Sequence, residues 1–340
     1  MDRFTRLRAG ATHTTRILEV GPSHAPIAAR ADGWRSETVD HTDTESLRTK
    51  YAAMGVSTAR IEEVDHVWQG GRLDECIPAD RHGAYDLLIA SHVVEHLPDL
   101  VGLLASAEKL LAAGGAISLA VPDKRYCFDF FKPLTTTGDL LAANAATRTP
   151  GGSIHSRRTA WNHLAYSVTL DNTIAWGQHP VANPRFIHNF QDAEQAMRAW
   201  RDDGSQPYAD YHAWQFTPSS FALIILELGM IGAIDWHIES QSPAEGCEFF
   251  VLLRRGAEKL DANALPLRRM DLLRGTMREL ADQLTWFGVV APATTTPADT
   301  SELTAQIQRH DARLTLLEAR PPWTHSLAAI LRRLVAGRRG

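Results

Sequence analysis

The feature that most constrains the fold is an alternation of short apolar runs with helix-like stretches, which extends from Arg16 to about Val121. This alternation is typical of βαβ units, in which helices connect parallel strands and cover the sheet. Apolar side chains gather on one face of the stretch Leu100–Leu111, which is therefore predicted to be a helix packed on the sheet. The apolar runs predict five strands, at Arg16–Val20, Glu37–Asp40, Ile61–Asp65, Tyr85–Ala90 and Ala116–Val121. We expect an α/β fold with a mostly parallel sheet.

The alternation stops at Pro122, and regular structure returns only at Thr217. The residues between, about 122–216, are rich in tryptophan, histidine and turn-forming residues, and we expect them to form an insertion that caps the substrate site. Thr217 is a favourable N-cap residue and Pro218 suits the first helical position, so a helix is predicted through Leu228. A turn-like segment separates two further predicted strands, Ala233–Glu239 and Glu248–Arg254. They suit an antiparallel hairpin at the sheet edge, which completes a domain at residues 1–256.

The C-terminal residues are organised differently. A helix is predicted around Pro266–Phe287, within a helical extension at residues 257–290, and residues 291–300 form a linker rich in threonine, alanine and proline. Residues 301–319 carry a short heptad-like pattern, which suits either a coiled coil that forms a homo-oligomer or an amphipathic helix packed on its own domain. The last residues, through 340, combine apolar side chains with arginines and form a basic amphipathic tail. This tail suits peripheral membrane association or an exposed helix equally well.

Composition narrows the class of protein. Hydrophobic residues make up 44% of the chain and charged residues 22%, as in ordinary globular proteins. The formal net charge of -5 provides no field that attracts nucleic acid, so a small or glycan-like substrate is expected. The three cysteines lack the spacing of a metal site and fit reduced thiols. Because no secretory h-region follows the first arginines, we expect a cytoplasmic protein.

Two strand ends carry the residues that a nucleotide-type cofactor requires. Such a cofactor needs close approach of the backbone after the first strand and an acid after the second that accepts hydrogen bonds from its ribose. Glu19-Val20-Gly21 ends the first predicted strand, and Asp40 ends the second. This order resembles class I S-adenosylmethionine-dependent methyltransferases. The resemblance implies that the Gly21 backbone meets the amino-acid part of S-adenosylmethionine and that Asp40 holds the ribose.

The loop after Gly21 departs from the family pattern, because only the first glycine of Gly-x-Gly-x-Gly is present. A dinucleotide-binding fingerprint also requires the later glycines, so that alternative is disfavoured too. The resemblance continues at Asp65, where the family places an acid near the adenine, and at Tyr85–Leu97, a buried strand followed by a polar crossover. It implies a Rossmann-like fold with a seven-stranded, mostly parallel sheet and an antiparallel last strand. The predicted cofactor-binding residues are Glu19, Gly21, Pro22, Ser23, Asp40, His41, Asp65, His66, Ser91 and His92.

Glu95-His96, near the end of that segment, allows two interpretations. The favoured one is the start of a helix, where the helix dipole stabilises the acid, and the other is a catalytic pair. A general base is expected elsewhere, because a hydroxyl acceptor must lose its proton. His163 and His212 are the candidates, since neutral imidazole accepts protons near pH 7 and aromatic residues that could stack on a sugar surround both.

The remaining substrate-side predictions concern the insertion. The histidines there show no short spacing typical of a metal site, so no metal is predicted. Hydrogen-bonding and aromatic side chains in the insertion are the candidates for contact with the acceptor. They are Asp123, Lys124, Arg125, His155, Trp161 and Trp214.

Two segments of the chain, 121–126 and 212–221, resemble methyltransferases that accompany glycosyltransferases in bacterial surface-polysaccharide synthesis. The expected function is therefore O-methylation of a sugar or polysaccharide with S-adenosylmethionine, in the cytoplasm either free or at the inner face of the membrane. The alternatives are a small-molecule or lipid-head-group methyltransferase and a scaffold that keeps the fold without turnover.

Overall fold

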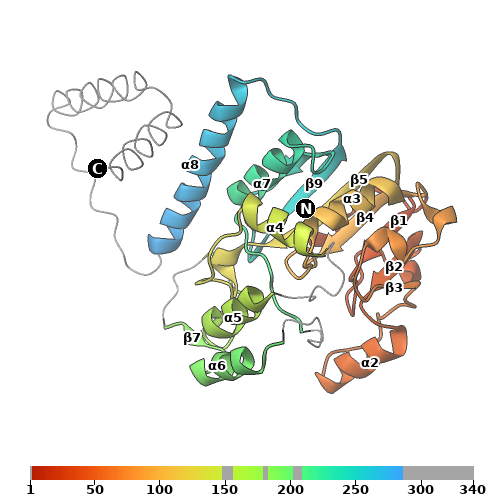
Figure 1. Cartoon of the computed structure of the whole chain (residues 1–340). Helices are drawn as coiled ribbons and strands as arrows, with labels where there is room; N and C mark the ends of the chain where they lie inside the picture. The colour runs from red at the N-terminus through yellow and green to blue at the C-terminus, as the bar shows by residue number, and fades with distance from the viewer. Residues whose placement is uncertain (1, 148–155, 179–182, 202–208, 286–340) are drawn as a thin grey trace, which may run out of the picture. The chain divides into compact units, whose positions relative to one another are not determined.

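The computed structural model describes residues 2–147, 156–178, 183–201 and 209–285, which belong to one compact unit (Figure 1). Its centre is a seven-stranded sheet in the order β3-β2-β1-β4-β5-β9-β8. The first five strands are parallel, and β9 is antiparallel to both of its neighbours. The strands of this sheet are β1 (Ile17–Val20), β2 (Ser36–Asp40), β3 (His66–Val67), β4 (Tyr85–Ser91), β5 (Leu111–Pro122), β8 (Trp236–Gln241) and β9 (Glu248–Arg255). The predicted Rossmann-like sheet with an antiparallel last strand is confirmed.

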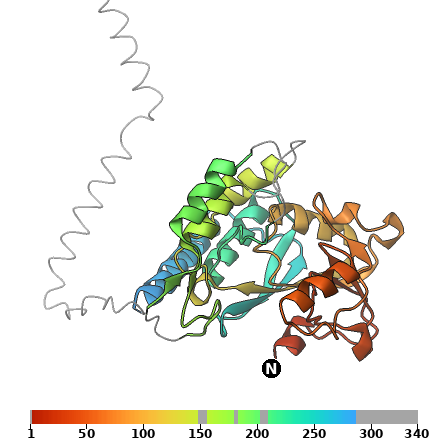
Figure 2. The same ribbon diagram turned by 90° about the horizontal axis from the view of Figure 1, so that it is seen from below.

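Helices and turns complete the unit (Figures 1 and 2). The helices are α1 (Arg3–Leu7), α2 (Thr44–Ala53), α3 (Leu100–Leu110), α4 (Thr137–Thr147), α5 (Arg157–Tyr166), α6 (Phe190–Ala199), α7 (Pro218–Met230) and α8 (Ala264–Thr285). Single 3-10 turns are η1 (Arg30–Asp32), η2 (Leu73–Glu75), η3 (Ala79–Arg81) and η4 (Lys124–Tyr126). Because side chains alternate along β4, Leu88 joins a core formed with α3 and α7, whereas Leu87 and Ile89 join a second core with Leu7 of α1.

Helix starts follow the capping residues. α7 begins as predicted at Pro218, and the hydroxyl of Ser220 in its first turn accepts a hydrogen bond from the backbone N–H of Thr217 at 2.9 Å. α3 begins at Leu100, where the carboxylate of Asp99 accepts a hydrogen bond from the backbone of Gly102 at 2.8 Å. The interpretation of Glu95 as a helix start is therefore wrong, since the helix begins five residues later.

The predicted strand Ile61–Asp65 is also wrong, because β3 contains only His66 and Val67. The acids before it form hydrogen bonds with other segments. Asp65 accepts one from the backbone N–H of Thr38 at 2.7 Å, and Glu62 accepts one from the backbone N–H of Arg30 at 2.9 Å. These side-chain bonds add to a main-chain bond from the N–H of Asp65 to the carbonyl of Thr38 at 3.1 Å.

Asp74 of η2 fastens the turn to α3. Its carboxylate accepts hydrogen bonds from Ser106 and Lys109, both at 2.6 Å. Burial works against the charged form, but these two bonds and the charges of Lys109 and Arg72 together outweigh it and lower the pKa of Asp74 to about 2. The ionised carboxylate therefore contributes stability above the ordinary pKa of 3.8, and this contribution is lost as the pH falls toward 2.

We expect Asp74→Asn to lower the free energy of unfolding by about 2 kcal/mol at pH 7 and by roughly half as much at pH 3. Urea unfolding at the two pH values measures both differences. Asp80→Asn, which changes an exposed acid in the neighbouring turn, is the matched control and should change stability little. If Asp74→Asn lowers the free energy of unfolding equally at both pH values, the ionised carboxylate of Asp74 does not contribute the stability described above.

The insertion leaves the sheet after β5 and contains α4, α5, α6 and a two-stranded sheet of β6 (Val168–Thr169) and β7 (Arg185–Phe186). Helices α5 and α6 lie side by side (Figure 2). The role of the insertion as a substrate cap stays a prediction.

α8 corresponds to the predicted helix of the extension and packs on α7. The predicted linker at 291–300 and the heptad and tail at 301–340 lie outside the described residues. No helix in the described part of the chain is long and apolar enough to cross a membrane.

Candidate active site

The loops after β1 and β4 meet at the carboxyl ends of their strands. Gly21 has a φ of +67°, which favours glycine, and a Cβ on this residue would lie 2.6 Å from Cγ2 of Val93. The strand order reverses between β1 and β4, and this is the edge at which open α/β sheets bind ligands. The structure thus requires glycine at the position that the sequence predicted for close approach of a cofactor.

Asp40 connects the end of β2 to the same loop. Its buried carboxylate accepts hydrogen bonds from the backbone N–H of Ser23 at 3.0 Å and of His41 at 2.8 Å, and it lies 2.6 Å from Nδ1 of His41. Gly21, Pro22, Ser23, Asp40 and His41 are therefore brought together, as a cofactor site requires. Glycine at the close approach and a carboxylate at the next strand end fit the amino-acid and ribose parts of S-adenosylmethionine.

Glu19 supports this loop from inside the fold. Its buried carboxylate accepts hydrogen bonds from the backbone N–H groups of Ile27 at 2.6 Å and Ala28 at 3.0 Å. Burial raises the pKa of Glu19 to about 7, although the two hydrogen bonds favour the ionised form. Glu19 was predicted to bind the cofactor, and the structure places it as a brace for the loop.

His66 pairs with Val39 near the carboxyl end of β2, but the side chains of Asp65 and His66 bond to earlier residues of that strand. Asp65 is level with Thr38 in the middle of β2, and the imidazole of His66 lies 3.1 Å from Glu37, near the start of that strand. Their predicted contact with the cofactor is corrected for this reason. The residue that follows β3 is Trp68, whose backbone N–H donates to the carbonyl of Asp40 at 2.8 Å.

Ser91 and His92 lie at the end of β4, where they were predicted. Arg3 donates a hydrogen bond to the hydroxyl of Ser91, and Nε2 of His92 lies 2.7 Å from the carboxylate of Glu248. Burial alone would lower the pKa of His92, but the hydrogen bond to Glu248 and the charge of Glu95 raise it. Arg3 and Glu248, which sequence reasoning missed, thus bond to the two residues at the end of β4 and to each other.

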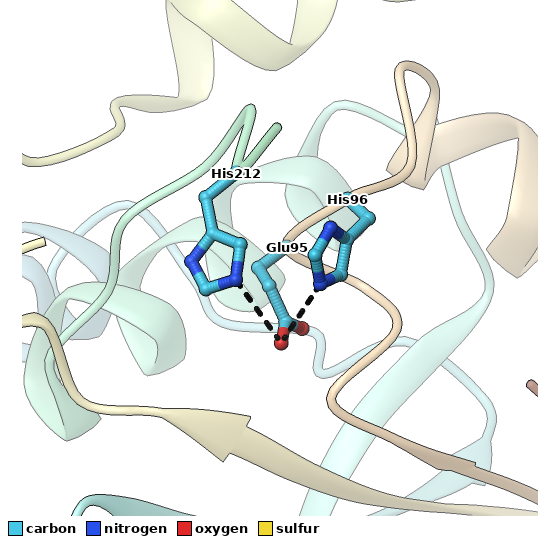
Figure 3. A group of neighbouring side chains, drawn as sticks. All are labelled: Glu95, His96 and His212. Carbon is cyan, nitrogen blue, oxygen red and sulfur yellow. Dashed lines mark ion pairs between the residues drawn. The ribbon is translucent and has the colours of Figure 1, made fainter. Parts of the chain in front are cut away.

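A buried cluster follows in the turn after β4 (Figure 3). Glu95 is fully buried, and neither carboxylate oxygen has a hydrogen-bond partner among the described residues. Its Oε1 lies 3.8 Å from Nε2 of His96 and 4.0 Å from Nε2 of His212. The backbone carbonyl of Glu95 accepts hydrogen bonds from Ala213 and Trp214, so the end of the insertion is fastened to this turn.

The two predicted bases belong to one network but are placed differently. Nδ1 of His212 lies 2.6 Å from the buried carboxylate of Asp129, which also forms a 2.6 Å ion pair with Lys132. Nζ of Lys132 lies 3.4 Å from Nδ1 of His163. Burial and the charge of Lys132 lower the pKa of His163 to about 3, so its imidazole is neutral. His212 faces Glu95, whereas His163 lies at the far end of the network.

The three residues at the end of β5 that were predicted to contact the acceptor are buried and bonded to other parts of the protein. Asp123 and Arg125 form a buried ion pair at 2.6 Å, and Lys124 donates to the carbonyl of Phe130 at 2.8 Å. Burial lowers the pKa of Lys124 to about 8. Arg125 also donates to the carbonyl of Glu279 in α8, so these three residues join the insertion to the C-terminal helix.

The two tryptophans that were predicted to contact the acceptor pack differently. The indole N–H of Trp214, which is buried, donates to the carbonyl of Leu97. Trp161 packs edge-on against Phe190, with ring centroids 5.8 Å apart. His155 lies outside the described residues.

The family is defined by comparison with known sequences. A family model described as a methyltransferase domain matches residues 2–204. The chain belongs to this family, and it is an S-adenosylmethionine-dependent methyltransferase. No curated protein matches the chain.

Solved structures with a similar arrangement include three methyltransferases. One from Methanosarcina mazei is 10% identical (76% of this chain and 100% of that chain, TM-score 0.36). CcbJ from Streptomyces caelestis is 12% identical (74% and 93%, TM-score 0.38), and one from Mesorhizobium loti is 12% identical (73% and 95%, TM-score 0.34).

Proposed function

We propose that the protein methylates a hydroxyl group of a sugar or surface polysaccharide, and that the acceptor hydroxyl loses its proton at the cluster of Glu95, His96 and His212. The observation that carries this proposal is the buried carboxylate of Glu95, which faces two imidazoles beside the loops at the cofactor edge. A neutral hydroxyl is a weak nucleophile and must lose its proton during transfer, whereas a neutral amine already offers a lone pair. Buried basic groups next to the cofactor edge therefore favour an oxygen acceptor.

Some residues near the cluster position the imidazole of His212, and the cluster itself accepts the proton of the acceptor. Bound S-adenosylmethionine supplies a methyl group on a sulfonium, so the acceptor oxygen bonds to the methyl carbon while the carbon–sulfur electron pair remains on sulfur. Asp129 orients His212 through Nδ1 and leaves Nε2 directed at Glu95. The proton of the acceptor leaves through this cluster to solvent.

A sugar acceptor is favoured by the aromatic rings around the cluster. The ring of Phe128 lies 4.4 Å from that of His212, and the ring of Tyr211 lies 4.7 Å from that of His163. Aromatic faces can stack on the apolar face of a sugar ring. The resemblance of segments 121–126 and 212–221 to methyltransferases of surface-polysaccharide synthesis supports the same class of acceptor.

The proposed location is the cytoplasm, at the inner face of the membrane, where lipid-linked glycans are assembled. Its support is the basic amphipathic sequence near the C-terminus, since arginine and tryptophan favour an anionic surface. Residues 301–319 are the proposed contact for a homo-oligomer.

The acceptor class is tested by incubating the protein with S-adenosylmethionine that carries a deuterated methyl group. Bacterial glycans, amine-containing small molecules and lipid head groups are offered in separate reactions. We expect production of S-adenosylhomocysteine only with glycans, and mass spectrometry of the product should place the label on a hydroxyl oxygen. Label on nitrogen, or turnover only with small molecules or head groups, would refute the proposed acceptor. Cofactor binding without turnover on any acceptor would indicate a scaffold.

A further inference from the structure

Three potential metal-ligand atoms converge in the cluster of Glu95, His96 and His212 (Figure 3). One ligand atom from each residue lies within 4.8 Å of the others. Glu95 Oε1 lies 3.8 Å from one imidazole nitrogen and 4.0 Å from the other, which is too far for hydrogen bonds. A cation with bonds of about 2.0–2.2 Å holds neighbouring ligand atoms about 3.0–3.6 Å apart. Small side-chain movements would therefore close the site around an ion.

Each imidazole has a carboxylate close to its Nδ1, and the carboxylate of Asp129 is hydrogen-bonded to His212. Nδ1 of His212 lies 2.6 Å from Asp129, and Nδ1 of His96 lies 3.0 Å from Asp210. A carboxylate at Nδ1 favours the tautomer with its proton there, so that Nε2 presents a lone pair to the cluster. This arrangement of carboxylate, histidine and metal is common behind the ligands of metal sites.

Glu95 supplies the independent observation. A fully buried carboxylate is costly unless a positive charge or hydrogen bonds compensate it. Neither oxygen of Glu95 has a hydrogen-bond partner among the described residues, and its ion-pair neighbours there are histidines. The nearest of these, His92, forms its hydrogen bond with Glu248. A bound cation would compensate the carboxylate directly.

We propose that Glu95, His96 and His212 bind a divalent transition-metal ion of the Zn²⁺ or Mn²⁺ type. Two imidazoles and one carboxylate suit these ions, whereas Mg²⁺ and Ca²⁺ prefer oxygen ligands. Three protein ligands leave positions open for the acceptor. Metal binding itself does not depend on the proposed function, but the role of the metal in methyl transfer does. Coordination of the acceptor hydroxyl would lower its pKa, and its proton would then pass to solvent.

Metal binding is tested without any acceptor. The full-length protein is freed of metal with a chelator and titrated with Zn²⁺ by calorimetry, and Mn²⁺ binding is followed by electron paramagnetic resonance. We expect one site per chain and no comparable affinity for Mg²⁺. Glu95→Gln and His212→Ala should each weaken binding by at least about 100-fold, and Asp129→Asn by about 10- to 100-fold. His163→Ala, which removes a nearby imidazole outside the ligand set, is the matched control and should retain the affinity of the wild type.

A second readout separates a metal ligand from a structural acid. In the metal-free protein, Glu95→Gln removes an uncompensated buried charge and should leave thermal stability equal or higher, while the stabilisation by Zn²⁺ disappears. Lower stability of metal-free Glu95→Gln would indicate that imidazolium ions pair with Glu95, and it would overturn the inference. Absence of binding by the wild type, or equal binding by Glu95→Gln, would also overturn it. Each of these results would overturn metal binding and leave the proposed transfer to a hydroxyl untouched. Conversely, a protein that binds metal but transfers no methyl group to a hydroxyl would refute only the proposed function.

Discussion

Replacing Gly21 by alanine is expected to reduce the affinity for S-adenosylmethionine by at least about 100-fold, which corresponds to about 2.7 kcal/mol. Two costs combine. The left-handed conformation of this residue costs a side chain about 1–2 kcal/mol. The added Cβ would also lie 2.6 Å from Cγ2 of Val93, a branched side chain that cannot easily move aside. The loop must shift to relieve the contact, and the backbone that approaches the cofactor shifts with it. Calorimetric titration measures the affinity.

Two further variants separate these costs. Adding Val93→Ala to Gly21→Ala removes the clash and should restore part of the affinity, while the conformational cost remains. Gly232→Ala introduces a side chain at a φ of +71° in open space after α7, and it should lower stability while leaving cofactor affinity unchanged. If Gly21→Ala binds S-adenosylmethionine as tightly as the wild type, the cofactor does not use this loop.

The second large effect is expected for His212→Ala, which should reduce turnover by about 10²- to 10⁴-fold while cofactor affinity changes little. His212 links the two halves of the cluster, because Asp129 holds its Nδ1 and its Nε2 faces Glu95. Asp129→Asn keeps the size of the side chain but loses its charge, so the orientation of His212 and part of the turnover should be lost. Initial rates of S-adenosylhomocysteine formation measure both effects.

His163→Ala is the informative comparison, because sequence analysis favoured both histidines equally. The low pKa of His163 and the ammonium of Lys132 at its Nδ1 make it a poor proton acceptor. We expect its loss to reduce turnover less than about tenfold. The opposite ranking of the two variants would assign proton removal to His163.

The sequence predicted the sheet and the cofactor edge because both follow from local order. Gly21 and Asp40 end successive strands, and the carboxyl ends of parallel strands share one edge, so their proximity needed no knowledge of packing. The same reasoning failed for Asp65, because a weak apolar run did not reveal that its carboxylate bonds to the backbone of Thr38. It also failed for Asp123-Lys124-Arg125, whose burial depends on α8, about 150 residues away.

The buried cluster could not be predicted from spacing. Its side chains lie at positions 95, 96 and 212, and only the return of the insertion onto the turn after β4 brings them together. Asp129 and Lys132, which orient the predicted histidines, were missed for the same reason. Local reasoning assigned Glu95 to a helix start because an acid is favoured there, whereas tertiary packing buries it.

Titration of the wild-type protein with S-adenosylmethionine, and separately with NAD, tests the central claim most directly. Both cofactors use a glycine after the first strand and an acid after the second, but the loop after Gly21 lacks the later glycines that a pyrophosphate requires. We predict one site per chain for S-adenosylmethionine, with competition by S-adenosylhomocysteine, and no binding of NAD. Binding of NAD without binding of S-adenosylmethionine would contradict the account.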